Sequence, residues 1–180
     1  MASRVRFAYR ELVRVERGIR VEEQAAAARP RPIRGVEKQI AEVAIWLMSR
    51  ANTLIFRATG GRVGSSFLRG APICLVTMRG RKTGRERTVP LIYLKDGRDY
   101  VIVASKGGMD EHPLWYLNLK ANPDAEVEIG RERTAVRAAT ASPEEKARLW
   151  PRLVEIYPDY ADYQRRTERE IPVVILRPAA

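Results

Sequence analysis

The sequence ICLVTMRGRKTGRERTVPLIYL, residues 73–94, contains the features that decide the fold of this chain. Two apolar runs, Ile73 to Met78 and Thr88 to Leu94, flank a short turn. This pattern predicts two antiparallel strands joined as a β-hairpin. The turn contains two glycines, and we expect Gly80 and Gly84 to adopt positive φ and to bring backbone N–H groups close to a ligand.

The charge of this turn is unusual for a plain connection between strands. Glu86 is opposed by five cations: Arg79, Arg81, Lys82, Arg85 and Arg87. Such a cluster would neutralise a bound phosphate or carboxylate. A solvated turn that keeps two strands soluble accounts for the same residues, and a short basic motif does not by itself separate the two interpretations.

Four more strands are expected after the hairpin. Their patterns lie at Tyr100–Ser105, Ala125–Ile129, Thr134–Thr140 and Ile171–Leu176. The segment Lys95-Asp-Gly-Arg98 predicts a tight turn into the first of them. Six largely antiparallel strands with helices at the edges predict an α+β fold, either a barrel or a strongly curled sheet.

Helices are expected between and after these strands. A short helix is predicted near Leu114 to Lys120. A second begins at Ser142, because a serine followed by proline and then Glu145 is typical of a capping box. Pro158 should interrupt this helix, and a further helical piece follows it.

The N-terminal part divides into a basic leader at 1–35 and the start of the folded domain, 36–180. The leader has a thin apolar stripe under an arginine-rich face, which is compatible with an anionic membrane surface and with a solvated extension. Apolar residues at helical spacing from Glu37 to Ala58 predict a helix that ends at Gly60.

Composition restricts the partners of the chain. A net charge of +11 over 180 residues favours an anionic partner: nucleic acid, anionic lipid or a polyanionic small molecule.

The only cysteine, Cys74, lies in an apolar run and should be a buried, inert thiol. His112 is the only histidine, so we expect no metal centre. No signal peptide or membrane span is recognisable, and we expect a cytoplasmic protein.

Three tyrosines recur at every third position: Tyr157, Tyr160 and Tyr163. On one helical face they would form an aromatic wall suited to a flat ligand, although ordinary core packing also explains them. Together with the basic turn, such a wall would suit a ligand that has a planar part and an anionic tail.

Four motifs in order resemble the deazaflavin-dependent nitroreductase family of actinobacteria. They are Thr77 to Leu91, Tyr100 to Gly108, His112 to Pro123, and the C-terminal stretch from Trp150 to Val173, which contains the three tyrosines and Arg169. The resemblance covers about residues 50–178. It implies a split β-barrel, FMN-binding-like, with flanking helices, that binds coenzyme F-420, an 8-hydroxy-5-deazaflavin with a phosphodiester and an oligoglutamate tail.

The resemblance also implies roles for individual residues. The phosphate would be held by Arg81, Lys82 and Arg87, and Thr83 would be a further cofactor-binding residue. The deazaflavin would be lined or supported by Pro90, Ser105, Lys106, Gly107, Trp115 and Asn118. The substrate pocket would contain Tyr157, Tyr160 and Tyr163. Tyr160 and Ser105 are the candidate catalytic residues, as hydrogen-bond donors to an acceptor that takes up a hydride from the reduced cofactor.

The acceptor implied in this way is a quinone, an enone or a nitro-aromatic compound. Three alternatives stay open: an FMN-dependent reductase on the same barrel, a binding protein for the deazaflavin without turnover, and a basic module for nucleic acid or a membrane surface. No aromatic-interleaved RNA-binding strand or helix-turn-helix pattern supports nucleic acid. Contact of the leader with the inner membrane face is compatible with the enzyme, because a quinone acceptor is lipid-soluble.

Overall fold

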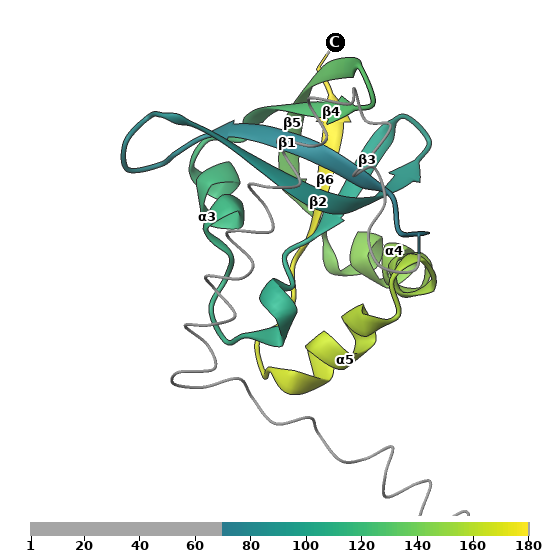
Figure 1. Cartoon of the computed structure of the whole chain (residues 1–180). Coiled ribbons are helices and arrows are strands. Elements are labelled where there is room, and N and C mark those ends of the chain that lie inside the picture. Colours follow the sequence, from purple (N-terminus) through teal and green to yellow (C-terminus); the bar gives the residue numbers. More distant parts are fainter. Residues whose placement is uncertain (1–69, 180) are drawn as a thin grey trace, which may run out of the picture. The chain divides into compact units, whose positions relative to one another are not determined.

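Six antiparallel strands close into a barrel in the computed structural model, which describes residues 70–179. The order around the barrel is β1-β2-β3-β6-β5-β4, and the helices cluster below it in Figure 1. The strands are β1 (Ile73–Arg79), β2 (Glu86–Asp96), β3 (Asp99–Val103), β4 (Asp124–Ile129), β5 (Glu132–Thr140) and β6 (Val173–Pro178). The predicted α+β barrel with flanking helices is confirmed, and so is each of the six strands.

The hairpin predicted from residues 73–94 is present. Its register runs from Ile73 opposite Ile92 to Arg79 opposite Glu86, so both strands extend further toward the basic turn than the apolar runs indicated. The C-terminal strand β6 closes the barrel between β3 and β5, where Val103 pairs with Val173. Because the two strands are antiparallel, this pairing brings the residues just before β6 beside the segment that follows β3, where the Ala104 N–H donates to Pro172 O at 2.9 Å.

Two apolar clusters lie on opposite sides of β3. Val101 and Val103 face a cluster with Leu149, Leu153 and the tyrosines of the C-terminal helices. Ile102 faces the other cluster, which contains Cys74. Side chains alternate between the two faces of a strand, so one strand contributes to both clusters. Burial raises the pKa of the Cys74 thiol to about 12, which agrees with the inert cysteine predicted from the sequence.

Within residues 70–179, three α-helices and one 3-10 turn flank the barrel: η2 (Lys106–Gly108), α3 (Leu114–Ala121), α4 (Pro143–Ile156) and α5 (Asp159–Arg166). The predicted capping box is confirmed, because the Ser142 N–H donates to the Glu145 carboxylate at 2.8 Å and the Glu145 N–H donates to Ser142 Oγ at 3.2 Å. The helix ends at Ile156 and α5 starts after Pro158.

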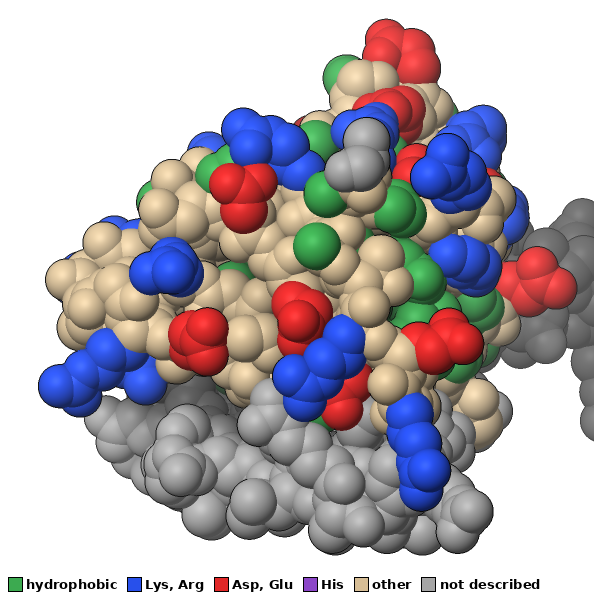
Figure 2. Space-filling model, turned by 90° about the horizontal axis from the view of Figure 1, so that it is seen from above, with side chains coloured by type: hydrophobic (Ala, Val, Ile, Leu, Met, Phe, Trp, Pro, Cys, Tyr) green, Lys and Arg blue, Asp and Glu red, His purple; other side chains and the backbone are tan. Residues whose placement is uncertain are grey.

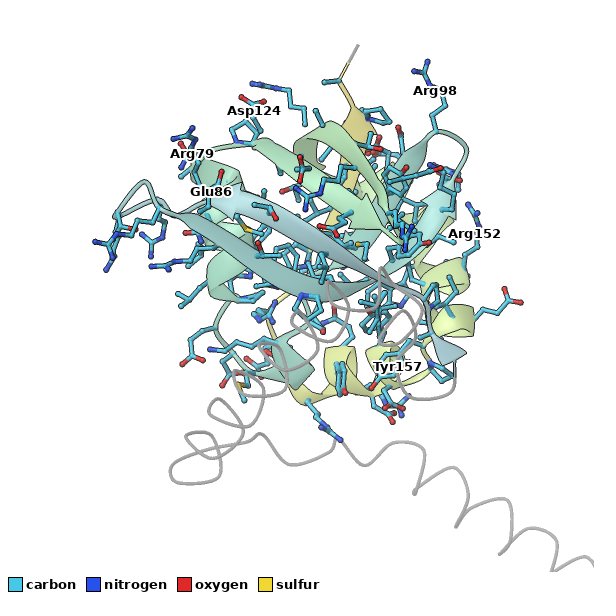
Figure 3. All side chains as sticks on the ribbon, turned by 45° about the horizontal axis from the view of Figure 1, so that its top comes forward. Arg79, Glu86, Arg98, Asp124, Arg152 and Tyr157 are labelled. Atoms are coloured by element: carbon cyan, nitrogen blue, oxygen red, sulfur yellow. The ribbon has the colours of Figure 1, made fainter. Side chains whose placement is uncertain are left out.

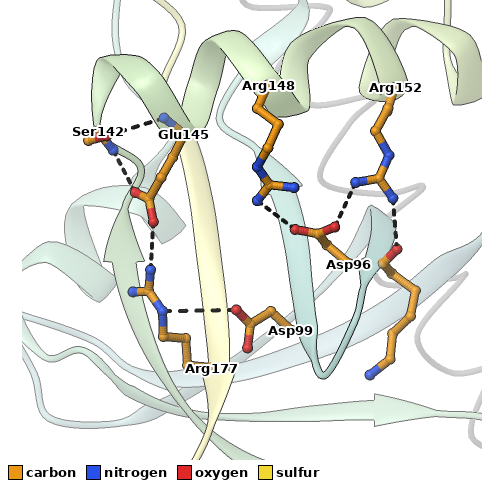
Figure 4. Close-up of polar contacts among 8 residues, drawn as sticks. Asp96, Asp99, Ser142, Glu145, Arg148, Arg152 and Arg177 are labelled. Atoms are coloured by element: carbon orange, nitrogen blue, oxygen red, sulfur yellow. Dashed lines mark hydrogen bonds and ion pairs between the residues drawn. The ribbon is translucent and has the colours of Figure 1, made fainter.

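An ion-pair cluster fastens α4 to the hairpin of β2 and β3 (Figure 4). Arg148 and Arg152 donate to the two carboxylate oxygens of Asp96 at 2.7 and 2.6 Å. These hydrogen bonds lower the pKa of Asp96 to about 2. Arg177 of β6 joins the same region by donating to Glu145 at 2.8 Å.

Two of the predictions from the sequence lie outside the described residues: the leader at 1–35 and the helix expected from Glu37 to Ala58. Between residues 70 and 179, no helix is long and apolar enough to cross a membrane. Within the same range, no group of three or more His, Cys, Asp or Glu side chains could hold a metal ion. Acidic and basic side chains are interspersed on the face shown in Figure 2.

Candidate functional site

The basic turn between β1 and β2 projects beyond the barrel (Figure 1), and most of its backbone N–H groups already have partners. The Gly80 N–H donates to Arg85 O at 2.8 Å, and the Thr83 and Gly84 N–H groups donate to Gly80 O at 3.2 and 2.7 Å. The Arg85 N–H approaches Thr83 Oγ1 at 3.4 Å. An anion held here therefore depends on side chains more than on the backbone N–H groups expected from the sequence.

The two glycines of the turn serve different purposes. Gly84 has φ +65°, as expected. The same expectation for Gly80 is wrong, because positive φ is not found there. At Gly80 an added Cβ would instead make tight contacts, because it would lie 3.2 Å from both Arg85 O and Thr83 Oγ1. Thr83 thus helps to shape the turn.

The cations of the turn are exposed and point into solvent. Within residues 70–179, no carboxylate lies within ion-pair distance of Arg79, Arg81, Lys82, Arg85 or Arg87. Elsewhere on the same surface, arginines such as Arg133, Arg137 and Arg148 are paired. A phosphate or carboxylate group fits this set of uncompensated charges.

Asn118 connects the turn to α3. Its side-chain oxygen Oδ1 accepts a hydrogen bond from the Arg81 N–H at 3.2 Å. Trp115 lies one helical turn earlier, half-buried, with its ring edge-on to Tyr116 at 6.2 Å between centroids. Two of the residues expected near the deazaflavin, Trp115 and Asn118, thus lie on the helix that contacts the basic turn. Pro90 lies on the neighbouring strand β2, half-buried and opposite Leu75.

The segment after β3 has an unusual backbone. Lys106, Gly107 and Gly108 all have positive φ, at +48°, +65° and +78°. A Cβ on Gly108 would lie 2.7 Å from the carbonyl oxygen of Tyr163, so this glycine allows the segment to pack directly on α5. The structure therefore brings Ser105, Lys106 and Gly107 next to the helix that contains Tyr160 and Tyr163. The Lys106 ammonium pairs with Glu111 at 3.6 Å.

The three tyrosines form one cluster, but they are not equally accessible. The hydroxyls of Tyr157 and Tyr163 lie 3.2 Å apart, and the ring of Tyr160 is 5.1 Å from Tyr157 and 6.4 Å from Tyr163. Tyr157 and Tyr160 are each 4% exposed, whereas Tyr163 is half-buried. Burial raises the pKa of Tyr157 and of Tyr160 above the usual tyrosine value, so both are neutral phenols that can donate a hydrogen bond.

Figure 3 shows Tyr157 beside the C-terminal helices and Arg79 at the hairpin end of the barrel. The cationic turn and the tyrosine cluster are therefore separate regions. They are connected by α3 and by the segment 105–108 along the helical side of the barrel in Figure 1. A ligand that uses both must be elongated, with its anionic part at the turn and its planar part nearer the tyrosines.

Arg169 is a residue of this region to which the sequence assigned no role. Its guanidinium donates hydrogen bonds to Met109 O at 2.8 Å, Ser105 O at 2.8 Å and Ala104 O at 3.2 Å. The sequence feature that could have pointed to Arg169 is its position in the last family motif, four residues before β6 begins. Its partners lie 60 to 65 residues away in the chain. Local sequence patterns do not predict contacts over this separation.

Comparisons with known proteins identify the family of the chain. Residues 47–178 match the family model described as F420H(2)-dependent quinone reductase. An F420H(2)-dependent quinone reductase of Mycobacterium tuberculosis strain H37Rv is 45% identical over 130 residues, which is 71% of this chain and 87% of the relative. A second relative from that strain is 47% identical over 117 residues, covering 65% of this chain and 98% of the relative.

Solved structures give the same result. One described as an F420-H2 dependent reductase matches with a TM-score of 0.56 and 44% identity, over 59% of this chain and 94% of that one. Another, described as a domain-swapped dimer, matches with a TM-score of 0.59 and 38% identity, over 73% of this chain and 97% of that one.

Proposed function

Because the chain belongs to the F420H(2)-dependent quinone reductase family, we propose that it takes a hydride from reduced coenzyme F-420 and passes it to a quinone. The observation that carries this proposal is the set of uncompensated cations on the β1–β2 turn, joined through Asn118 to α3. An enone or a nitro-aromatic compound is the alternative acceptor, because each offers an electrophilic centre of similar shape.

We assign the phosphodiester of F-420 to side chains of the β1–β2 turn. Arg81, Lys82 and Arg87 would hold it, and Arg79 and Arg85 would add positive potential for the acidic tail. Thr83 supports them by shaping the turn through its contact with the Arg85 N–H. Arginine suits this task because its planar fork can donate two hydrogen bonds to one phosphate group.

The planar ring is assigned to the region between β2, α3 and the segment 105–108. Pro90 and Trp115 offer half-buried apolar surface, and Ser105, Lys106 and Gly107 offer polar groups of a strained loop. When bound, F-420 supplies the hydride chemistry, and these residues orient its ring against the acceptor and exclude water. Backbone strain concentrated at one loop is typical of sites where a ligand is held in a defined geometry.

The acceptor is assigned to the tyrosine side of the ring. Tyr157, Tyr160 and Tyr163 form the wall, and Tyr160 and Ser105 are the proposed donors of hydrogen bonds to the negative charge that develops on the acceptor oxygen. Because burial keeps the Tyr160 phenol neutral, it can act as a donor over the whole physiological pH range. No general base is needed for this step.

The test is a titration of the full-length protein with reduced F-420 and, separately, with FMN, followed by fluorescence and then by addition of menadione. Selective binding of F-420 with menadione-dependent oxidation supports the proposal. Binding of FMN alone would favour the flavin alternative, and binding of F-420 without oxidation by a quinone, enone or nitro-aromatic acceptor would favour a non-catalytic carrier. Binding of neither would favour the basic nucleic-acid or membrane module.

We further propose that the leader at 1–35 contacts an anionic membrane surface, where a lipid-soluble quinone is concentrated. Its arginine-rich sequence supports this proposal. Co-sedimentation with vesicles containing anionic lipid, compared with neutral vesicles, tests it. Equal recovery with both vesicle types, or with neither, would contradict it.

A further inference from the structure

The guanidinium of Arg169 is partly buried between the loop after β3 and the start of β6. Besides its three carbonyl partners, its Nη1 lies 3.4 Å from His112 Nδ1. Within residues 70–179, no carboxylate lies within ion-pair distance of it, and burial lowers its pKa. A partly buried arginine usually has a carboxylate partner, because desolvating the charge is costly. Arg169 is instead hydrogen-bonded to the carbonyls of one loop, while the charges of Asp110 and Glu111 partly oppose the effect of burial on its pKa.

The contacts fix the orientation of two consecutive peptide planes. In a trans peptide the C=O and the following N–H point in opposite directions. Arg169 Nη2 holds both Ala104 O and Ser105 O. The N–H groups in the same planes, those of Ser105 and Lys106, are therefore directed away from Arg169.

The backbone conformation here is that of an anion-binding nest. Ser105 is in the right-handed helical region, with φ −73° and ψ −42°, and Lys106 follows with φ +48°. Such a pair makes successive N–H groups converge on one point, which suits an anionic or electron-rich ligand edge. The positive φ of a non-glycine residue is costly. The hydrogen bonds from Arg169 to the preceding carbonyls offer a physical reason why this conformation persists.

The same guanidinium determines the state of His112. Arginine has only N–H donors, so the contact at 3.4 Å favours a His112 Nδ1 that accepts, with the proton on Nε2. The ring of Tyr116 packs against the imidazole at 5.0 Å. Burial, Arg169 and Lys120 all lower the pKa of His112, which keeps the imidazole neutral. Both ends of the loop, Ser105 and His112, are thus held by one side chain.

We infer that Arg169 is a positioning residue: it holds the loop 104–112 so that the Ser105 and Lys106 N–H groups face the electron-rich edge of the deazaflavin, and it keeps His112 as the Nε2–H tautomer. This inference rests on the proposed function for the identity of the ring. The hydrogen bonds by which Arg169 orients the loop 104–112 do not depend on the cofactor. Arg169 acts through the backbone of Ser105 and Lys106 and touches neither the hydride donor nor the acceptor.

The test compares Arg169→Lys and Arg169→Ala with Arg165→Ala as the matched control. Arg165 is an exposed arginine of the same segment that pairs with Asp162 on α5. Lysine keeps the charge but loses the fork, so both Arg169 variants should weaken F-420 binding by about tenfold or more. The control should bind like the wild type. Guanidinium chloride far below denaturing concentrations should restore binding to Arg169→Ala, and ammonium should not.

A second readout needs no cofactor. The chain contains a single histidine, so its imidazole signals in nitrogen-15 NMR are unambiguous. The wild type should show the Nε2–H tautomer. In Arg169→Lys, and in Arg169→Ala if it folds, His112 should show mixed tautomers, and in the alanine variant its pKa should rise. Circular dichroism verifies the fold of each variant.

The outcomes separate this inference from the proposed function. Wild-type F-420 affinity in folded Arg169→Lys would overturn the positioning role. If His112 shows the same tautomer in the folded Arg169 variants as in the wild type, Arg169 does not determine the tautomer of His112. If the wild type binds no F-420, the proposed function fails, whereas the NMR comparison still decides whether Arg169 holds the loop.

Discussion

The Arg81 N–H donates to the side-chain oxygen of Asn118 at 3.2 Å, across 37 residues of sequence. This hydrogen bond ties the turn that is rich in cations to the helix that presents Trp115. It also couples the two parts of the proposed cofactor site, the phosphate end and the ring end, because α3 contributes to both.

The coupling predicts the behaviour of two Asn118 variants. Asn118→Ala removes the acceptor of the Arg81 N–H and should weaken F-420 binding severalfold, the effect of losing about 1 kcal/mol. Asn118→Asp keeps an acceptor at the same place and should retain the geometry of the turn, although its charge opposes the phosphate. Fluorescence titrations at several salt concentrations check this, because the loss of affinity relative to the wild type should shrink with added salt only in the aspartate variant. Identical curves for all three proteins would contradict the coupling.

The cations of the turn should act on affinity and not on the hydride step. Lys82→Ala and Arg87→Ala should each raise the dissociation constant of F-420 by about ten- to hundredfold, as expected for charge-assisted hydrogen bonds to phosphate. The turnover number at saturating cofactor should change little. Arg98→Ala is the control, since Arg98 is an exposed cation in the β2–β3 turn (Figure 3). Equal losses in all three variants would indicate a general charge effect.

Gly108 should tolerate no side chain. In Gly108→Ala the Cβ would lie 2.7 Å from Tyr163 O at a φ of +78°, so α5 must shift away from the segment 105–108. We expect a loss of about 2–4 kcal/mol in stability, the sum of backbone strain and a steric clash. Gly130→Ala is the matched control, because Gly130 has φ +61° and no atom within 4 Å of the added Cβ. Urea unfolding of both variants checks the difference, and equal losses would mean that close packing on α5 is unimportant.

Stability should fall in acid through Asp96. Its folded pKa of about 2 lies below the ordinary value of 3.8. The carboxylate therefore contributes stability that is complete above about pH 4 and is lost as the pH falls toward 2. The contribution should be at most about 1 kcal/mol, since the paired arginines are exposed and screened by salt. Asp96→Asn should flatten this part of the pH profile of the unfolding free energy; an unchanged profile would remove Asp96 as its cause.

Tyr160→Phe should lower the turnover number while leaving F-420 affinity near normal. Phenylalanine preserves the buried ring of a residue that is 4% exposed, so only the hydroxyl is lost, and a missing donor to a developing oxyanion costs about 10²-fold. Stopped-flow oxidation of bound cofactor by menadione measures this. Tyr163→Phe is the comparison, because Tyr163 is the more exposed of the two residues. If cofactor oxidation is slowed only in Tyr163→Phe, the hydrogen-bond donor is Tyr163 and not Tyr160.

Local sequence patterns were sufficient for the elements of the fold. The apolar runs that become β1 and β2, the glycine-containing turns and the capping box at Ser142 depend on residues within a few positions of one another. Local rules also have limits, and Gly80 shows one. Its Cβ position is close to Arg85 O across the turn, and the preference of glycine for positive φ does not predict such a contact.

The sequence alone determined the strands, the helix starts, the cationic turn and, through its ordered motifs, the family. Only the tertiary structure decided how these parts meet: β6 closing the barrel beside β3, Asn118 reaching the turn, Gly108 packing on α5 and Arg169 holding the loop after β3. The physical reason is the range of the interactions. Backbone propensity and capping act over a few residues, whereas these contacts join residues that are far apart in the chain and become neighbours only when the barrel closes.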